Sequence, residues 1–142
     1  MPVNRLAADL RLVVTRMARR LRQHAGGGRS PSQLAMLATI ERRGPMTLGE
    51  LAAAEQVQPP SMTRIVASLE ERQLVIREPD PNDRRIARVR ISEEGTRYVE
   101  SSRTRRNEYL ADRLATFTNE ERKRLEQALP LLERLAEWEE SR

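Results

Sequence analysis

Arginine side chains stand at two places in the sequence where the neighbouring residues favour recognition of a charged polymer. Ser61, Thr63 and Arg64 lie near the start of one predicted helix, and Asp83-Arg84-Arg85 lies in a predicted turn between two strands. A guanidinium can donate two parallel hydrogen bonds to a guanine edge or to phosphate oxygens, and hydroxyl side chains donate to the same acceptors. These two segments therefore indicate a polyanion as the partner.

The sequence lacks the groups of residues that catalysis or metal binding requires. It has one histidine and no cysteine, which excludes disulfides, thiolate metal sites and redox sensing by a thiol. The glycine cluster at residues 26–28 leads into a predicted helix without a preceding strand, so it does not match a phosphate-binding loop. We predict no enzymatic activity, no catalytic residue, no metal site and no cofactor.

Positive charge is concentrated in two parts of the chain. Residues 1–29 contain seven Arg and one Asp, and residues 84–106 contain eight Arg and three Glu. Residues 107–142 contain six basic and nine acidic side chains, so the end of the chain is acidic. This distribution fits a polyanion partner, but taken alone it fits solvated helices equally well.

Membrane association is not expected. No stretch approaches the roughly 20 apolar residues that span a bilayer, and residues 1–14 lack the apolar run of a signal peptide. We therefore expect a cytoplasmic protein.

The spacing of apolar residues predicts long amphipathic helices near both ends of the chain. Residues 4–24 form the first, with Leu6, Leu10, Val13, Val14, Met17 and Leu21 on one face. The last begins at the capping box of residues 118–121 and contains Leu125, Leu129, Leu132, Leu135 and Trp138. Pro130 is expected to kink this last helix.

Between the terminal helices, the pattern predicts a helix-turn-helix followed by a β-hairpin. A capping box at residues 47–50 opens a short helix, and Pro59-Pro60 opens a second one after a turn. Residues 75–78 and 86–91 read as strands, the second with alternating apolar and Arg residues. Ser92 then caps a further long helix.

The string PPSMTRIVASLEERQLVIREPDPNDRRIARVRISEEG, residues 59–95, resembles the signature of the MarR (multiple-antibiotic-resistance regulator) family. The resemblance implies a mainly α fold with a small β-wing: a winged helix-turn-helix flanked by N- and C-terminal dimerisation helices. It implies one MarR-type domain over residues 1–142, with a DNA-binding lobe at 30–91 and dimerisation helices at 1–25 and 107–142.

The family's DNA contacts carry over to specific residues of this chain. In the recognition helix, Ser61, Thr63 and Arg64 are placed to face base edges, and Ser68 to face phosphate or nothing. Arg64 either reads guanine or contacts a phosphate; its side chain suits both. In the wing, the resemblance implies that Arg85 enters the minor groove of double-stranded DNA and that Asp83 pairs with a neighbouring Arg. Arg84 and Arg88 are expected to contact phosphate or to form salt bridges.

The resemblance also implies a homodimer, formed by the leucine-rich terminal helices, that acts as a repressor on a pseudopalindromic operator. A small aromatic or phenolic ligand would release it. Arg16, Met17, Arg20 and Met36 are the candidates for the ligand pocket, although each also reads as core or surface. A winged helix that contacts protein or RNA is the alternative, but it would not need the cationic tip.

Gln73 departs from the family pattern, which usually has glycine after the recognition helix. If the backbone turns there as in the family, Gln73 must adopt a left-handed conformation at a cost of about 1 kcal/mol.

Overall fold

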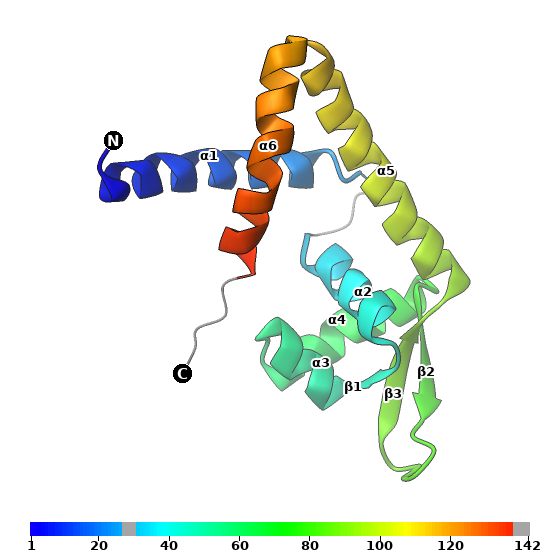
Figure 1. The fold of residues 1–142 in the computed structure, drawn as a ribbon. Coiled ribbons are helices and arrows are strands. Elements are labelled where there is room, and N and C mark those ends of the chain that lie inside the picture. Colours follow the sequence, from blue (N-terminus) through cyan, green and yellow to red (C-terminus); the bar gives the residue numbers. More distant parts are fainter. Residues whose placement is uncertain (27–30, 138–142) are drawn as a thin grey trace. The chain divides into compact units, whose positions relative to one another are not determined.

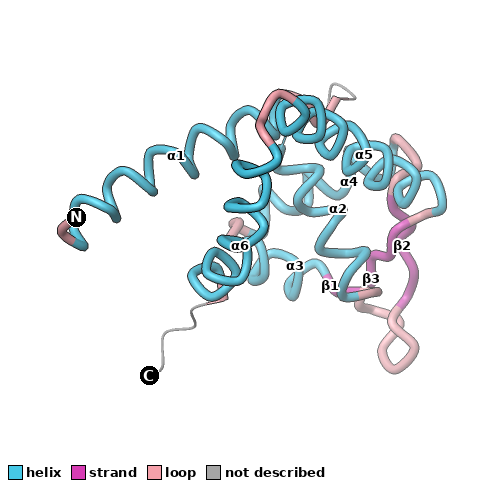
Figure 2. The backbone as a smooth tube through the Cα atoms, turned by 45° about the horizontal axis from the view of Figure 1, so that its top comes forward, coloured by secondary structure: helices cyan, strands magenta, loops and turns pink. Residues whose placement is uncertain are grey.

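The computed structural model describes residues 1–26 and 31–137, and it is mainly helical with one small sheet (Figures 1 and 2). The elements in chain order are α1 (Val3–Gln23), α2 (Pro31–Arg43), β1 (Met46–Thr47), α3 (Leu48–Glu55), α4 (Pro59–Glu71), β2 (Val75–Pro79), β3 (Ala87–Ile91), α5 (Glu93–Ala115) and α6 (Asn119–Ala136). The predicted fold class, helices with a small β-wing, is confirmed.

The chain divides into two compact units. The first comprises Met1–Arg106, and the second begins at Asn107 within α5. The described core lies in the first unit, where α2, α3, α4, the sheet and the start of α5 bury aliphatic side chains: Met36, Leu37, Ile40, Met46, Leu51, Ala52, Met62, Val66, Leu69, Leu74, Val75, Val89 and Val99. The helix-turn-helix and the hairpin therefore share one core.

The sheet has three antiparallel strands in the order β1-β3-β2 (Figure 2). β3 lies in the middle, with Val89 paired to Met46 on one side and to Arg77 on the other. Val89 is fully buried and Ile91, on the same face, packs against the core, whereas Arg88 and Arg90 on the opposite face form ion pairs. The sequence analysis missed β1, because two residues are too few to show a period.

The helix-turn-helix begins and turns where the sequence predicted. Thr47 caps α3: its hydroxyl accepts from the Glu50 amide at 3.1 Å, and the Glu50 carboxylate accepts from the Thr47 amide at 3.3 Å. Gln56 ends α3 in a left-handed conformation, and α4 begins at Pro59. α4 buries Met62, Val66 and Leu69 and thereby exposes its opposite face.

A close junction joins the end of α4, the wing and the start of α5. Gln73 has a φ of 64°, so the left-handed conformation expected there is confirmed. The Ser92 hydroxyl donates to the carbonyl of Gln73 at 2.6 Å and accepts from the amide of Gly95 at 2.9 Å. A Cβ at Gly95 would lie 2.1 Å from the Leu74 carbonyl oxygen, so only glycine fits.

The terminal helices expose their apolar faces. Neither α1 nor α6 contains a buried residue, and α6 continues through Pro130 to Ala136. The exposed large apolar side chains are Val3, Leu6, Leu12, Val13, Val14 and Met17 of α1 and Leu125, Leu129, Leu131, Leu132 and Leu135 of α6. Trp138, expected on the same face of the last helix, lies outside the described residues.

We expect Gly95→Ala to destabilise the protein by at least about 2 kcal/mol, because the new methyl group overlaps the Leu74 carbonyl and the backbone must shift. The measurement is urea unfolding, in which the midpoint should fall while the slope stays constant.

Gly49→Ala is the matched control. The nearest atom to a Cβ at Gly49 is the Thr47 hydroxyl oxygen at 3.9 Å, an ordinary contact, and the residue lies in α3. Alanine should leave stability unchanged or raise it by up to about 1 kcal/mol. Equal destabilisation by both substitutions would contradict a specific steric role for Gly95.

Candidate nucleic-acid interface

The exposed face of α4 carries the residues that the sequence placed in the recognition helix. Thr63 and Arg64 are exposed, while Ser61 and Ser68 are half-buried. The Thr63 hydroxyl donates to the Pro59 carbonyl at 3.0 Å, so its proton is used within the helix and the oxygen is left as an acceptor. Arg64 is therefore the strongest hydrogen-bond donor on this face.

An open depression of about 340 Å³ brings three of these residues together, and its lining consists of Gln33, Ser61, Arg64, Ile65 and Ser68. The Gln33 side-chain amide donates to the Ser68 hydroxyl at 3.3 Å. Gln33 comes from the first turn of α2, and nothing in its local sequence connects it to a residue 35 positions away. This contact is the part of the α4 surface that the sequence analysis missed.

The hairpin between β2 and β3 carries the second group of predicted residues at its tip. The Asp83 carboxylate accepts from Nε of Arg85 at 3.0 Å and from its terminal NH2 at 3.1 Å. The Arg85 side chain nevertheless remains 90% exposed. The predicted pairing of Asp83 with a neighbouring arginine is confirmed, and the partner is Arg85 itself.

Asp80 organises the base of the tip and was not among the predicted site residues. It is 6% exposed, and its carboxylate accepts from the amides of Asn82 at 2.8 Å and Asp83 at 3.1 Å. The other carboxylate oxygen pairs with Nε of Arg88. The Asp-Pro-Asn-Asp sequence indicates a turn that this side chain could close, but only the fold shows its burial.

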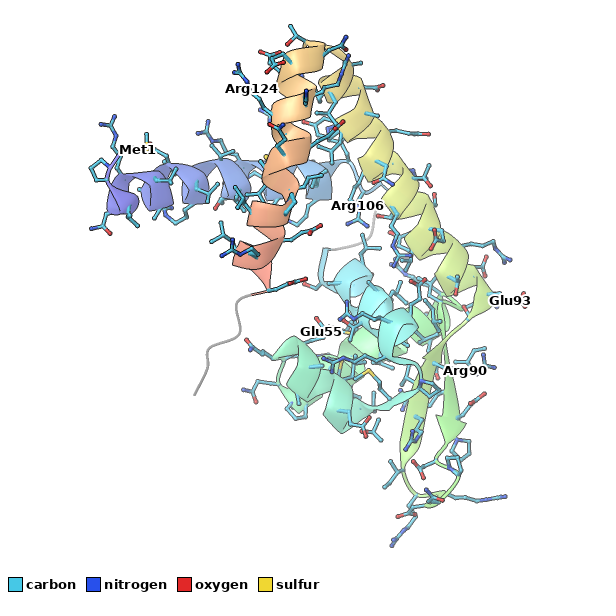
Figure 3. All side chains as sticks on the ribbon, viewed as in Figure 1. Met1, Glu55, Arg90, Glu93, Arg106 and Arg124 are labelled. Atoms are coloured by element: carbon cyan, nitrogen blue, oxygen red, sulfur yellow. The ribbon has the colours of Figure 1, made fainter. Side chains whose placement is uncertain are left out.

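Of the two alternatives for Arg88, the structure contains the salt bridge. The next arginine of β3, Arg90 (labelled in Figure 3), donates to Glu78 at 2.6 Å across the hairpin. Arg84, by contrast, is exposed at the tip. Arg88 and Arg90 are half-buried, whereas Arg84 and Arg85 are exposed, so the exposed cations of the tip are Arg84 and Arg85.

The ion pairs shift the protonation equilibria of the tip. The Arg88 guanidinium and the Asn82 amide lower the pKa of the Asp80 carboxyl. The hydrogen bonds from the Arg85 side chain and amide likewise lower the pKa of Asp83. The same contacts raise the pKa of Arg85 and Arg88, so both remain charged at any physiological pH.

Comparison with known proteins agrees with this geometry. Residues 30–87 match the model of the MarR family. The HTH-type transcriptional regulator MT0903.1 of Mycobacterium tuberculosis is 46% identical over 129 residues, which cover 90% of each sequence. The chain belongs to the MarR family.

Two further relatives extend the comparison of this MarR-family chain. The crystal structure of a proposed transcriptional regulator from Pseudomonas aeruginosa PA01 superposes with a TM-score of 0.84 at 38% identity and covers 95% of this chain and 96% of that one. The HTH-type transcriptional repressor MdtR of Bacillus subtilis is 30% identical over 94 residues, 66% of this chain and 61% of MdtR. The MarR-family chain is a DNA-binding transcriptional regulator.

The four residues predicted for a ligand pocket differ in burial. Met36 belongs to the core, at 1% exposure, whereas Arg16, Met17 and Arg20 lie exposed on α1. A cavity of about 190 Å³ lies elsewhere in the first unit of this MarR-family protein, lined by Arg22, Ala25, Gly26, Leu34, Ala35, Ala38, Val99 and Arg106. Arg22 and Arg106 are the cationic residues that sequence reasoning missed, because only the packing of α1, α2 and α5 brings them together.

Two further properties concern the described part of this MarR-family chain, residues 1–26 and 31–137. None of its helices combines the length and the apolar character that crossing a bilayer requires. Within the same residues, no cluster of three or more His, Cys, Asp or Glu side chains is arranged to hold a metal ion.

We expect the Asp80 and Asp83 carboxyls of the folded protein to titrate below the ordinary value of 3.8, because both accept hydrogen bonds in their charged forms. A carboxyl with a lowered pKa in the fold adds stability above its unfolded pKa, and this contribution disappears as the pH falls through the folded pKa. The wing-tip contacts should therefore be intact at neutral pH and be lost only below 3.8. An NMR titration of the side-chain carboxyl carbons checks this, and midpoints at or above 3.8 would contradict it.

Proposed function

We propose that this protein is a homodimeric repressor that binds a pseudopalindromic operator and is released by a small aromatic acid. The observation that carries the proposal is the placement of Arg64 and Arg85. Both are exposed, one on the recognition helix and one at the wing tip, and both belong to the same compact unit. A single winged helix thus presents one guanidinium for the major groove and one for the minor groove.

Arg64 contacts DNA from the first turns of α4, the part of a recognition helix that reaches base edges. Ser61 lines the same depression and Thr63 offers an acceptor, so both can add contacts to bases or to phosphates. A bidentate contact of Arg64 to guanine O6 and N7 would provide about 1–3 kcal/mol of discrimination. Ser68, which accepts from Gln33, faces the DNA backbone.

Arg85 enters the minor groove, and Arg84 contacts the flanking phosphates. A narrow A·T-rich groove concentrates negative potential, which attracts a guanidinium without a base-specific pattern. The bidentate pair with Asp83 orients the Arg85 guanidinium while leaving its side chain 90% exposed. The wing thereby adds recognition of DNA shape to the base reading of α4.

Dimerisation covers the apolar faces of α1 and α6. Leu6 of α1 and Leu125, Leu129, Leu132 and Leu135 of α6 are all exposed in the single chain, whereas Leu10 and Leu21 are half-buried. Exposed apolar stripes of this length mark an interaction surface. A twofold dimer would place two recognition helices in successive major grooves, about 10–10.5 bp apart.

Repression and its release rest on two observations. MdtR, whose name describes a repressor, shares 30% identity with this chain. The cavity lined by Leu34, Ala38 and Val99 also contains Arg22 and Arg106, a combination that suits an aromatic ring carrying a carboxylate. The cavity lies where α1 meets the DNA-binding lobe, so a ligand there would bias the position of the lobe.

Selection of bound duplexes from a random pool tests the proposal, because it yields the operator, the half-site spacing and the stoichiometry together. We expect a pseudopalindrome with half-sites about 10–10.5 bp apart and two chains per duplex. Selection with Arg64→Ala should return the same motif with one relaxed position per half-site. A motif without twofold symmetry would refute the dimeric operator, and an unchanged motif would reduce Arg64 to a phosphate contact.

Arg85→Ala should weaken operator binding strongly, because a dimer loses two inserted guanidinium groups. The loss should be larger on operators with A·T-rich flanks under the wings than on G·C-rich ones, since the narrow groove has the more negative potential. Arg85→Lys should restore only part of the affinity, because an ammonium is more strongly hydrated than a guanidinium. Fluorescence anisotropy at several salt concentrations separates lost counterion release from lost shape recognition. An equal loss on both operators, fully restored by lysine, would leave Arg85 as a generic phosphate contact.

A further inference from the structure

Asp80 is a buried carboxylate in a wing that is otherwise exposed at its tip. Asp80 is 6% exposed, whereas Arg84, Arg85 and Ile86, a few residues later, are all exposed. None of the DNA contacts proposed above uses Asp80. A buried charge is costly unless it is paired and hydrogen-bonded, so its partners show what it does.

Those partners form a continuous path from β3 to the tip. One carboxylate oxygen of Asp80 pairs with Arg88 of β3, and the other accepts from the amides of Asn82 and Asp83. The Asp83 carboxylate in turn accepts from the amide and the side chain of Arg85. Arg85 is thus connected to the sheet through two carboxylates in sequence.

Backbone hydrogen bonds close the same loop. The Asp80 amide donates to the Ile86 carbonyl at 2.8 Å, and the Ile86 amide donates to the Asp83 carbonyl at 3.0 Å. These two bonds do not involve the amides of residues 82 and 83. The Asp80 side chain is the group that holds the amides of residues 82 and 83 in one arrangement.

We propose that Asp80 is a positioning residue for DNA binding, which uses Arg88 as its anchor on β3 and holds Asp83 and Arg85 in the orientation that enters the minor groove. The inference rests on the proposed role of Arg85. Ordering a long side chain before binding removes that entropic cost from the binding step. Arg88 then acts within the protein and not on a phosphate.

A positioning role and a purely electrostatic role of Asp80 predict opposite changes in DNA affinity when its charge is removed. Asp80 places a negative charge in the wing, so removing the charge should strengthen attraction to DNA if charge alone mattered. If Asp80 positions the tip, the same substitution must weaken binding. The sign of the change therefore separates the two views.

The experiment compares Asp80→Asn with Glu78→Gln in the full-length protein. Asn keeps an oxygen that can accept from the two amides but loses the ion pair with Arg88. Glu78 lies on the same hairpin and pairs with Arg90 at 2.6 Å, and its carboxylate takes no part in the contacts of Asp80, Asp83 and Arg85 described above. Its substitution removes the same charge and leaves the tip intact.

Affinities are measured on two duplexes that carry the selected operator with A·T-rich or G·C-rich flanks, at several salt concentrations. We expect Asp80→Asn to bind the A·T-flanked duplex on the order of tenfold more weakly than wild type. Its preference for A·T flanks should fall towards that of Arg85→Ala. Glu78→Gln should bind both duplexes at least as tightly as wild type and keep the preference. If Asp80→Asn behaves like Glu78→Gln, the proposal is wrong.

Misfolding of a variant and failure of the Arg85 contact give results that differ from the one just described. A lower fraction of folded Asp80→Asn would weaken binding to both duplexes equally and leave the flank preference unchanged, which would also refute a positioning role. If Asp80→Asn does not fold, Arg88→Gln breaks the ion pair from the other side and should lower the flank preference; an unchanged preference refutes the proposal. If Arg85→Ala itself keeps the wild-type preference, the proposed minor-groove contact fails, and the positioning role of Asp80 fails with it; if only Asp80→Asn keeps the preference, the role of Asp80 alone is refuted.

Discussion

The DNA-binding lobe depends on a close approach of backbone to backbone at the junction of α4, the wing and α5. The Leu74 carbonyl occupies the space where a side chain at residue 95 would stand, and Ser92 bonds both Gln73 and Gly95. The left-handed turn at Gln73 directs the chain from the recognition helix into β2. One contact therefore sets the directions of the reading helix, the wing and the long helix, and explains why a Ser-x-x-Gly sequence begins α5.

The arginines of the wing fall into two groups that differ in their exposure. Arg88 and Arg90 are bound to Asp80 and Glu78, so they stabilise the hairpin. Arg85 is bound to Asp83 but remains exposed, and Arg84 is exposed beside it. The carboxylates reduce the net positive charge of a DNA-binding surface. The same carboxylates hold the wing tip in one conformation, and binding in a narrow minor groove depends on that conformation as well as on charge.

The helices near the two ends of the chain, α1 and α6, are distinguished by exposed apolar side chains. α1 and α6 expose leucines that their own compact units leave uncovered, and exposed apolar stripes of this kind mark interaction surfaces. The cavity beside the end of α1 combines small apolar side chains with Arg22 and Arg106. In the proposed dimer, a small acid bound in this cavity would act on the first unit, which also contains α4.

Local interactions account for what the sequence by itself determined. Helix periods, the capping boxes at Thr47 and Thr118 and the alternation of β3 depend on residues a few positions apart, and all were predicted. The left-handed turn at Gln73 was expected from the resemblance to the MarR family. The exposure of Arg64 and Arg85 follows from the same local patterns. Only the tertiary structure decided the burial of Asp80, the contact of Gln33 with Ser68, the core position of Met36 and the cavity arginines. These features arise where distant segments pack together, and a polar residue carries no local sign of whether packing will bury it or leave it in water.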